Sequence, residues 1–121
     1  MSDAAPNAPE ARPLVDFAVF QQLDLKTGKI LTAERHPSAD RLLVLSVDVG
    51  EAAPRPIVAG LAPYYPDPQT LVGATVVVVA NLKPVTLRGV RSEGMLLAAG
   101  GTDHRGLITV PGECPPGEVV R

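Results

Sequence analysis

The sequence is poor in the residues that covalent and metal chemistry most often needs. It has a single cysteine, Cys114, and only two histidines, His36 and His104. One thiol makes no internal disulfide, so a disulfide-stapled secreted domain is excluded and a reducing, cytoplasmic setting is expected. No spacing gathers these three residues, whereas a zinc site needs at least three ligands in one place. We therefore expect no metal, no other cofactor and no cysteine–histidine nucleophile pair.

Long apolar runs are also absent. A run such as Val76 to Ala80 is far shorter than the ~20 residues of a membrane-spanning helix, so no membrane partner is expected. The first residues, Met1 to Pro6, contain neither a basic region nor an apolar stretch, and we expect no secretory signal. The 121 residues, 45% of them hydrophobic, suffice for one domain with a core but not for two ordinary domains.

Aromatic side chains are few, and tryptophan is missing altogether. The four rings are those of Phe17, Phe20, Tyr64 and Tyr65, and none falls on a predicted strand. Proteins that bind single strands without sequence preference stack successive bases on aromatic side chains of their binding surface. That class is therefore disfavoured, and recognition of a folded RNA through shape, phosphate and ribose contacts suits the composition better.

Positive charge is in short supply overall. The net charge is −2 and the pI is about 5.6, which taken alone argues against a nucleic-acid partner. Basic residues are nevertheless concentrated locally: residues 26–41 contain four basic and two acidic side chains, and residues 81–95 contain three basic and one acidic. Because salt screens distant charges, local charge governs short-range binding, and both segments are candidates for contact with an anion.

Short apolar segments separated by glycine and proline predict an all-β chain. In residues 42–49, Leu43, Leu45 and Val47 alternate with polar positions, as in a strand with one buried face. Gly28 interrupts the first strand and is expected to mark a bulge or bend. Strands are predicted over residues 25–35, 42–49, 57–61 and 74–80, followed by one strand or two short ones within 95–99 and 107–110.

The remaining segments complete the predicted architecture. Residues 1–13, rich in alanine and proline, are expected to be a disordered tail that precedes a single domain over residues 17–121. Val15 to Phe20 is expected to form a helical turn that covers one end of the domain, and residues 67–71 another short helical turn. Five strands with a short helix between strands 3 and 4 describe an OB-fold barrel, an architecture that commonly binds oligonucleotides.

The segment that follows the fourth strand carries the most information about function. Between Asn81 and Ser92 it places Lys83, Arg88 and Arg91 within a dozen residues. A cationic, hydrogen-bonding loop held between two buried strands has the chemistry to grip a phosphate backbone. It offers no nucleophile and no acid–base pair, so we expect a binding protein and not an enzyme.

The chain from about residue 17 to residue 121 resembles the tRNA-binding domain family. This family includes the C-terminal domain of methionyl-tRNA synthetases, freestanding structure-specific tRNA-binding proteins and the endothelial-monocyte-activating polypeptide domain. Pieces such as His-Pro-x-Ala-Asp are weak alone, but their ordered succession is specific. The matching segments are Asp24–Ile30, His36–Leu42, Ile57–Leu61, Leu71–Gly73, Asn81–Pro84, Arg88–Gly89 and Ser92–Ala99, with Tyr65–Gln69 closest to the methionyl-tRNA synthetase branch.

The resemblance implies a non-catalytic OB-fold that forms a homodimer and binds the folded shape of tRNA with little sequence preference. Two departures weaken the match: Thr86 stands where a basic residue is usual, and Ala59 where serine is common. The synthetase body is missing from this chain. Carried over position by position, the candidate RNA-binding residues are Lys29, Arg41, Asn81, Lys83, Arg88, Ser92 and Met95.

Several alternatives stay open at this stage. Asn81 and Ser92 can equally tie down the surrounding loop, Met95 fits a core position, and Glu93 is expected to position a neighbouring arginine. One branch of the family resembles an export-related, peptide-binding chaperone. A third interpretation is an assembly module that dimerises or docks an aminoacyl-tRNA synthetase, with RNA binding secondary.

Overall fold

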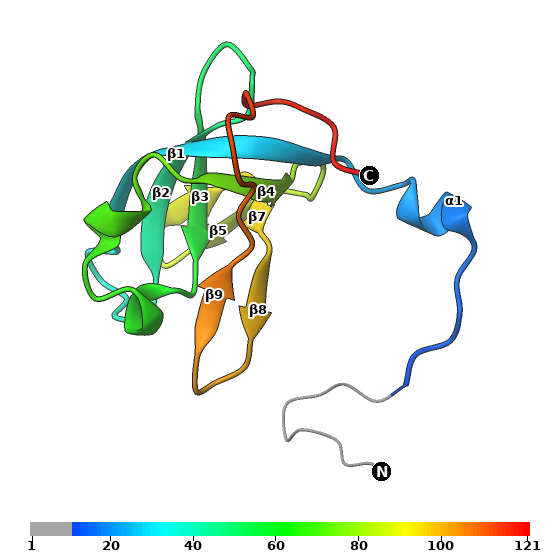
Figure 1. Ribbon diagram of the computed structural model, residues 1–121. Coiled ribbons are helices and arrows are strands. Elements are labelled where there is room, and N and C mark those ends of the chain that lie inside the picture. Colours follow the sequence, from blue (N-terminus) through cyan, green and yellow to red (C-terminus); the bar gives the residue numbers. More distant parts are fainter. Residues whose placement is uncertain (1–10) are drawn as a thin grey trace.

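The computed structural model describes residues 11–121, and most of the predicted 1–13 tail lies outside this range. Five antiparallel strands curl into a nearly closed barrel (Figure 1). Their order in the sheet is β3-β2-β1-β4-β7, which confirms the predicted five-stranded OB-like barrel. The strands are β1 (Leu25–Arg35), β2 (Leu43–Asp48), β3 (Arg55–Ala59), β4 (Thr75–Val79) and β7 (Met95–Leu96).

Strand β1 is long enough to pair with two neighbours in succession. Its first half pairs with β4, and its second half pairs with β2. The change of partner needs a bend, and a side chain at Gly28 would obstruct it. A Cβ atom there would lie 2.7 Å from a methyl group of Val47 and 2.8 Å from one of Val78. Gly28 thus has a packing role, since its bare backbone lets the strand lie directly on the core, while the register irregularity of β1 lies between Ile30 and Thr32.

The core is filled by aliphatic side chains from alternate strand positions. The burial of β2 alternates strictly between buried and half-buried residues, as a strand with one inward face requires. Closure between β3 and the segment before β7 relies on hydrogen bonds, including one from Glu93 N–H to Pro56 O of 2.7 Å. The largest fully buried side chains are Ile30, Leu43, Leu45, Val47, Val49, Ile57, Val76 and Val78.

The connection from β3 to β4 carries two turns of 3-10 helix, η1 (Ala62–Tyr64) and η2 (Pro68–Leu71). A helical element was predicted in this position, and the η2 bounds lie close to the predicted 67–71. The Asp67 side chain accepts a hydrogen bond from Gln69 N–H and caps η2. Each turn has a proline in its first two positions and is only three or four residues long. Such short segments form 3-10 turns and not one continuous α-helix.

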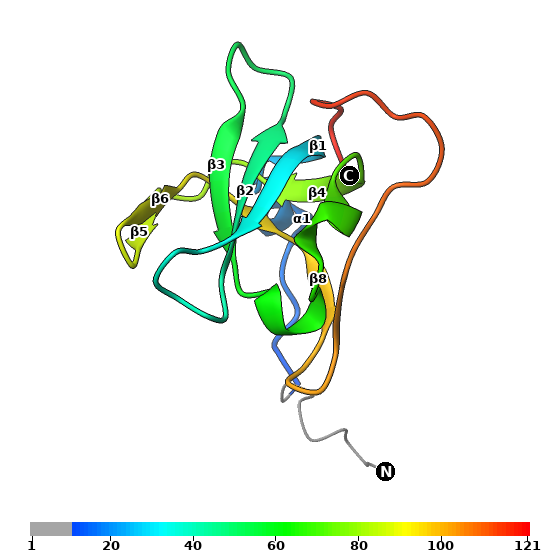
Figure 2. The same ribbon diagram turned by 90° about the vertical axis from the view of Figure 1, so that its left-hand side faces the viewer.

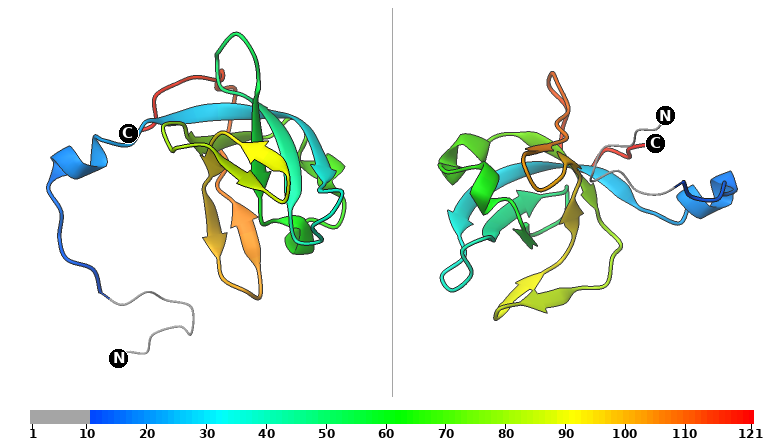
Figure 3. Two further views of the ribbon diagram at one scale, coloured as in Figure 1. Left: turned by 180° about the vertical axis from the view of Figure 1, so that it is seen from behind. Right: turned by 90° about the horizontal axis from the view of Figure 1, so that it is seen from below.

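The α-helix found among the described residues is α1 (Phe17–Phe20). It was predicted to cover one end of the barrel, and this prediction is wrong. It buries none of its residues and stands away from the barrel in Figures 1 and 3. The exposed fraction is 67% for Phe17 and 38% for Phe20. Four apolar residues have too little surface to hold a helical turn on the barrel without further contacts.

Two small hairpins complete the molecule. One consists of β5 (Val85–Leu87) and β6 (Val90–Ser92), the other of β8 (Ala98–Gly100) and β9 (Arg105–Leu107). The C-terminal segment then returns to β1, where Val119 forms an isolated antiparallel bridge with Lys26. The β5–β6 hairpin was predicted only as a loop.

Candidate nucleic-acid interface

The segment with Lys83, Arg88 and Arg91 forms the β5–β6 hairpin, which projects from the barrel beside β3 (Figure 2). Leu87 pairs with Val90, so Arg88 and Gly89 make a two-residue turn. Both have positive φ, 51° and 88°, which is the signature of the type I′ turn that suits twisted hairpins. Glycine satisfies that geometry at position 89 without strain.

The tip of the hairpin is held against the loop between β1 and β2. Arg88 Nη2 donates a hydrogen bond of 2.9 Å to the Ser38 carbonyl. Beside it, the buried His36 ring bridges the two segments: Nε2 lies 3.1 Å from Leu87 O, and Nδ1 accepts from Ser38 N–H at 3.0 Å. An Nδ1 that accepts a hydrogen bond carries no hydrogen of its own, which leaves Nε2–H as the donor to Leu87 O in this arrangement.

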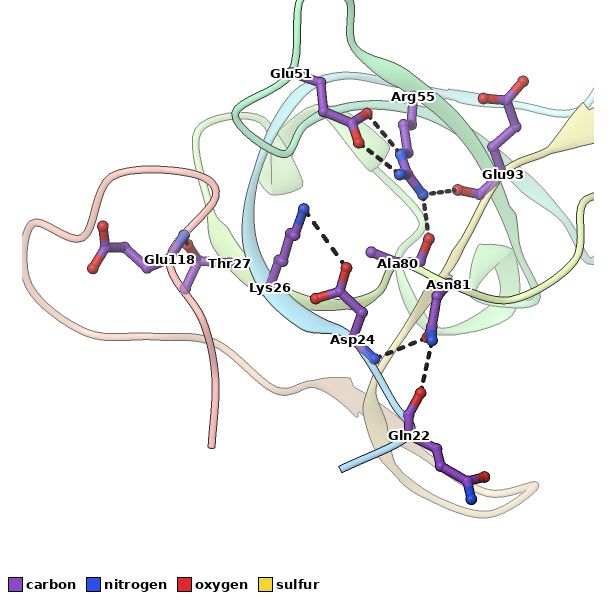
Figure 4. A network of polar contacts seen from close by, with 10 residues as sticks. All are labelled: Gln22, Asp24, Lys26, Thr27, Glu51, Arg55, Ala80, Asn81, Glu93 and Glu118. Atoms are coloured by element: carbon purple, nitrogen blue, oxygen red, sulfur yellow. Dashed lines mark hydrogen bonds and ion pairs between the residues drawn. The ribbon is translucent and has the colours of Figure 1, made fainter. Parts of the chain in front are cut away.

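The base of the hairpin is held by a single arginine from β3 (Figure 4). Arg55 Nη1 donates to Ala80 O at 2.6 Å and to Glu93 O at 3.1 Å. These two carbonyls flank the entire 81–92 segment. Arg55 also forms a bidentate ion pair with Glu51, in which Nε donates to Oε1 at 2.9 Å and Nη2 donates to Oε2 at 2.7 Å. Hydrogen bonding to Glu51 raises the pKa of Arg55 and lowers that of Glu51.

Asn81 uses both ends of its side-chain amide on the chain that precedes β1. Its Oδ1 accepts from Asp24 N–H at 2.8 Å, and its Nδ2 donates to Gln22 O at 2.7 Å (Figure 4). Ala80 N–H also donates to Asp24 O at 2.7 Å. The sequence left two roles open for Asn81, a structural one and contact with RNA. These hydrogen bonds show the structural role.

Ser92 and Met95 lie in opposite environments. The Ser92 side chain is buried, accepts from Val58 N–H at 2.9 Å and donates to Gly94 O at 3.2 Å. These bonds join the hairpin to β3 and leave the hydroxyl inside the fold. Met95, which fitted a core position, is instead 47% exposed. The side chain of Glu93 pairs with Arg91 at 2.9 Å, as predicted for this carboxylate.

The remaining candidate cations lie on different parts of the surface. Lys83 and Arg88 are exposed on the hairpin segment, and Arg41 is exposed at the end of the β1–β2 loop whose Ser38 meets the hairpin tip. Lys29 instead lines a depression formed with Gly73, Thr75 and residues 112–116. That C-terminal segment lies on the opposite side of the barrel from the hairpin (Figure 2). The structure thus brings Arg41 and Arg88 onto one connected pair of loops and separates Lys29 from them.

Sequence reasoning missed two arginines that the structure makes prominent. Arg55 was not singled out, and its spacing of four residues from Glu51 was the only available signal of the pair. Arg105, in β9, places its guanidinium 5.0 Å from the centre of the Tyr64 ring. No local pattern predicts that contact, because the two residues lie 41 positions apart and meet only through the tertiary fold.

Within residues 11–121, no group of three or more histidine, cysteine, aspartate or glutamate side chains is arranged to hold a metal ion. The helices of this range are also too short to span a membrane.

Comparison with known proteins places this barrel among its relatives. The chain is 49% identical over 90 residues to a methionine–tRNA ligase of Methanosarcina mazei, a match that covers 74% of this chain but 12% of the ligase. It is 38% identical, with a TM-score of 0.83, to a MetRS-related protein of Pyrococcus horikoshii, covering 91% of this chain and 100% of that one. The chaperone CsaA of Bacillus anthracis is 27% identical with a TM-score of 0.80, covering 90% and 100%.

The chain thus spans a small fraction of the ligase and matches the two solved structures over the whole length of their chains. Residues 25–119 match the family model described as "Putative tRNA binding domain". This match runs from the start of β1 to the bridge that Val119 makes with the same strand. The chain therefore belongs to the tRNA-binding domain family.

Proposed function

We propose that this protein is a non-catalytic tRNA-binding module that recognises folded tRNA through its shape and backbone. The observation that carries the proposal is the joined pair of loops, in which the basic β5–β6 hairpin and the β1–β2 loop are locked together by His36 and Arg88. In OB-folds, these two connections flank the usual nucleic-acid-binding face. Membership of the tRNA-binding domain family supports RNA as the ligand.

Within this proposal, the seven candidate residues divide into three groups. Lys83, Arg88 and Arg41 are exposed cations on the joined loops, and we assign them to phosphate contact. Asn81 and Ser92 shape the segment between them through the internal hydrogen bonds described above. Lys29 and the exposed Met95 lie outside the joined loops, and they contact RNA only if the ligand extends beyond the hairpin.

The test of this proposal is a salt titration of binding to total tRNA. The variant is Lys83→Ala with Arg88→Asn, because asparagine tolerates the left-handed backbone that Arg88 adopts. We expect weaker binding to every tRNA tested and a log–log salt slope that is shallower by ~0.7 to 0.9 for each lost phosphate contact. Arg121→Gln, at the exposed C-terminus, is the matched control for loss of one charge. Unchanged affinity and slope in the double variant would remove the hairpin from the interface.

We further propose that the protein is a homodimer joined through the segment around α1. Phe17, Val19, Phe20 and Leu23 are 67, 48, 38 and 47% exposed, and α1 extends from the barrel (Figure 1) without a buried residue of its own in the described part of the chain. Contiguous apolar surface of this kind is typical of interaction sites. Sedimentation of Phe17→Ser with Phe20→Ser should give a monomer, with Val72→Ser, an exposed apolar residue on the barrel, as the control. A dimeric double variant would place the interface elsewhere.

The relatives favour two finer assignments. Similarity to a domain of methionine–tRNA ligases supports association with an aminoacyl-tRNA synthetase in the cytoplasm. Recovery of a synthetase with the tagged protein after nuclease treatment would support this association. Recovery only while RNA is intact would contradict a direct contact.

Similarity to a chaperone along the whole barrel supports peptide binding as the second candidate function. Displacement of tRNA by an unfolded polypeptide would favour that function at a shared site.

A further inference from the structure

The structure assigns a second anion site to this protein, formed by Arg41 and Arg105, which takes a backbone phosphate of the bound RNA. This inference rests on the proposed function, since it extends the RNA-binding face from the hairpin to the far end of the β1–β2 loop. The site is a depression between that loop, η1 and the β8–β9 hairpin. Its lining consists of Arg41, Leu42, Gly60, Tyr64, Thr102 and Arg105.

Arg105 is held in place before any ligand arrives. Its guanidinium lies over the Tyr64 ring, donates to Gly60 O at 3.3 Å and donates to Gly101 O at 3.1 Å. The Tyr64 hydroxyl in turn donates to Thr102 O at 2.9 Å. All of these partners are uncharged, so they orient the guanidinium without neutralising it. A fixed cation loses little side-chain freedom when an anion binds.

Arg41 supplies the second charge in the lining of this depression. Its backbone is anchored by a hydrogen bond from Ala62 N–H to Arg41 O of 3.2 Å, while its side chain is exposed. Among residues 11–121, no carboxylate lies within 4.0 Å of either guanidinium; the ion pairs found there involve Lys26, Arg55 and Arg91. Two guanidinium groups without acidic partners that line one depression attract an anion and favour the oxygen geometry of phosphate.

The position of the depression explains why the anion is part of an RNA. The β1–β2 loop joins it to the hairpin: Ser38 and His36 hold the hairpin tip, and Arg41 lies only three residues beyond Ser38. A polynucleotide that contacts Arg88 at the tip and follows this loop reaches Arg41 and then Arg105. The depression is therefore continuous with the proposed interface and extends it.

The experiment compares tRNA affinity and its salt dependence in Arg41→Met, Arg105→Met and the double variant. The Arg41 side chain forms no hydrogen bond or ion pair within the described part of the chain, so Arg41→Met should leave the thermal midpoint unchanged. Arg105→Lys is included because it keeps the charge if Arg105→Met weakens the β8–β9 hairpin. Arg121→Met is the matched control. Each loss of a site arginine should make the log–log salt slope shallower by ~0.7 to 0.9, and the double variant should show the sum.

The outcomes separate this inference from the proposed function. If the hairpin variant Lys83→Ala with Arg88→Asn weakens binding while Arg41→Met with Arg105→Met leaves affinity and slope unchanged, the second site and the assignment of Arg41 to phosphate contact are overturned, and the hairpin stands as the interface. If the wild-type protein does not bind tRNA, both fail. A short polyglutamate peptide is the remaining probe: binding that the site variants abolish, with tRNA binding unaffected, would make the depression a carboxylate site and overturn the assignment to phosphate.

Discussion

Arg55 and Ala80 are joined by a 2.6 Å hydrogen bond between a guanidinium nitrogen and a main-chain oxygen, at the point where β4 ends and the basic hairpin segment begins. The same nitrogen reaches Glu93 O, where that segment ends. One side chain thus fixes the distance between the two ends of the hairpin segment, Ala80 and Glu93 (Figure 4). The hairpin itself is short and exposed, so its orientation depends on this clamp and on the contact of its tip with His36.

Removal of the clamp should destabilise the fold and loosen the hairpin. Arg55→Met leaves the Ala80 and Glu93 oxygens without their donor, and an unsatisfied buried acceptor costs about 1–3 kcal/mol. We expect a loss of unfolding free energy in this range by urea denaturation, together with weaker tRNA binding. Arg35→Met is the control, because Arg35 is exposed and donates to one carbonyl, that of Pro66. Equal unfolding free energies of the two variants would show that the hydrogen bonds of Arg55 to Ala80 O and Glu93 O do not stabilise the fold.

The ion pair behind the clamp predicts a dependence on acid. Hydrogen bonding to Arg55 holds the pKa of Glu51 below its ordinary value of 4.5. A carboxylate with a lowered folded-state pKa stabilises the protein above its unfolded pKa, and this stabilisation is lost as the pH falls through the folded-state pKa. Wild-type protein should therefore be more stable than Glu51→Gln at pH 7, and the difference should shrink once the pH drops below about 4.5.

Urea midpoints measured from pH 7 to pH 3 check this prediction. The carboxylate is exposed at the surface, so added salt should reduce the difference at pH 7. A difference between wild type and Glu51→Gln that stays constant over the whole pH range would contradict the proposed ion pair.

The contact of His36 with the hairpin tip predicts a second loss of stability. His36→Phe keeps a flat buried ring but leaves Leu87 O and Ser38 N–H without the partners that His36 provides. We expect a cost of about 1–3 kcal/mol and faster amide hydrogen exchange in residues 85–92. The exposed His104 offers a matched control, His104→Phe, for which neither effect is expected. Unaltered exchange in His36→Phe would mean that the hairpin keeps its place without this bridge.

Gly28 offers a test of the barrel wall itself. A Cβ atom there meets Val47 and Val78 methyl groups at 2.7 and 2.8 Å, and overpacking of a dense core costs about 1–3 kcal/mol. Gly28→Ala should therefore lower the thermal midpoint by several degrees. Gly106→Ala is the control, because a Cβ at Gly106 meets no atom within 4 Å. If calorimetry gives the same midpoint for both variants, the bend in β1 does not require glycine.

The strand pattern was predictable because it depends on near neighbours. Alternation along β2 and the valine-rich β4 follow directly from which faces are buried, and the predicted and observed bounds of β1 coincide. The β5–β6 hairpin escaped prediction because its turn, Arg88–Gly89, lacks the asparagine or aspartate that usually marks a type I′ turn. The prediction that α1 packs on the barrel was wrong because its apolar residues alone do not show which surface they contact.

By itself, the sequence determined the succession of the strands along the chain, the family and the concentration of cationic residues after β4, because each depends on residue type and local spacing. Only the tertiary structure decided which polar side chains are available to a ligand. It directed Asn81 and Ser92 inward to main-chain partners, separated Lys29 from the hairpin, and paired Arg105 with Tyr64. These outcomes depend on distances between segments far apart in the chain, which are set only when the barrel closes and buried polar groups must find partners.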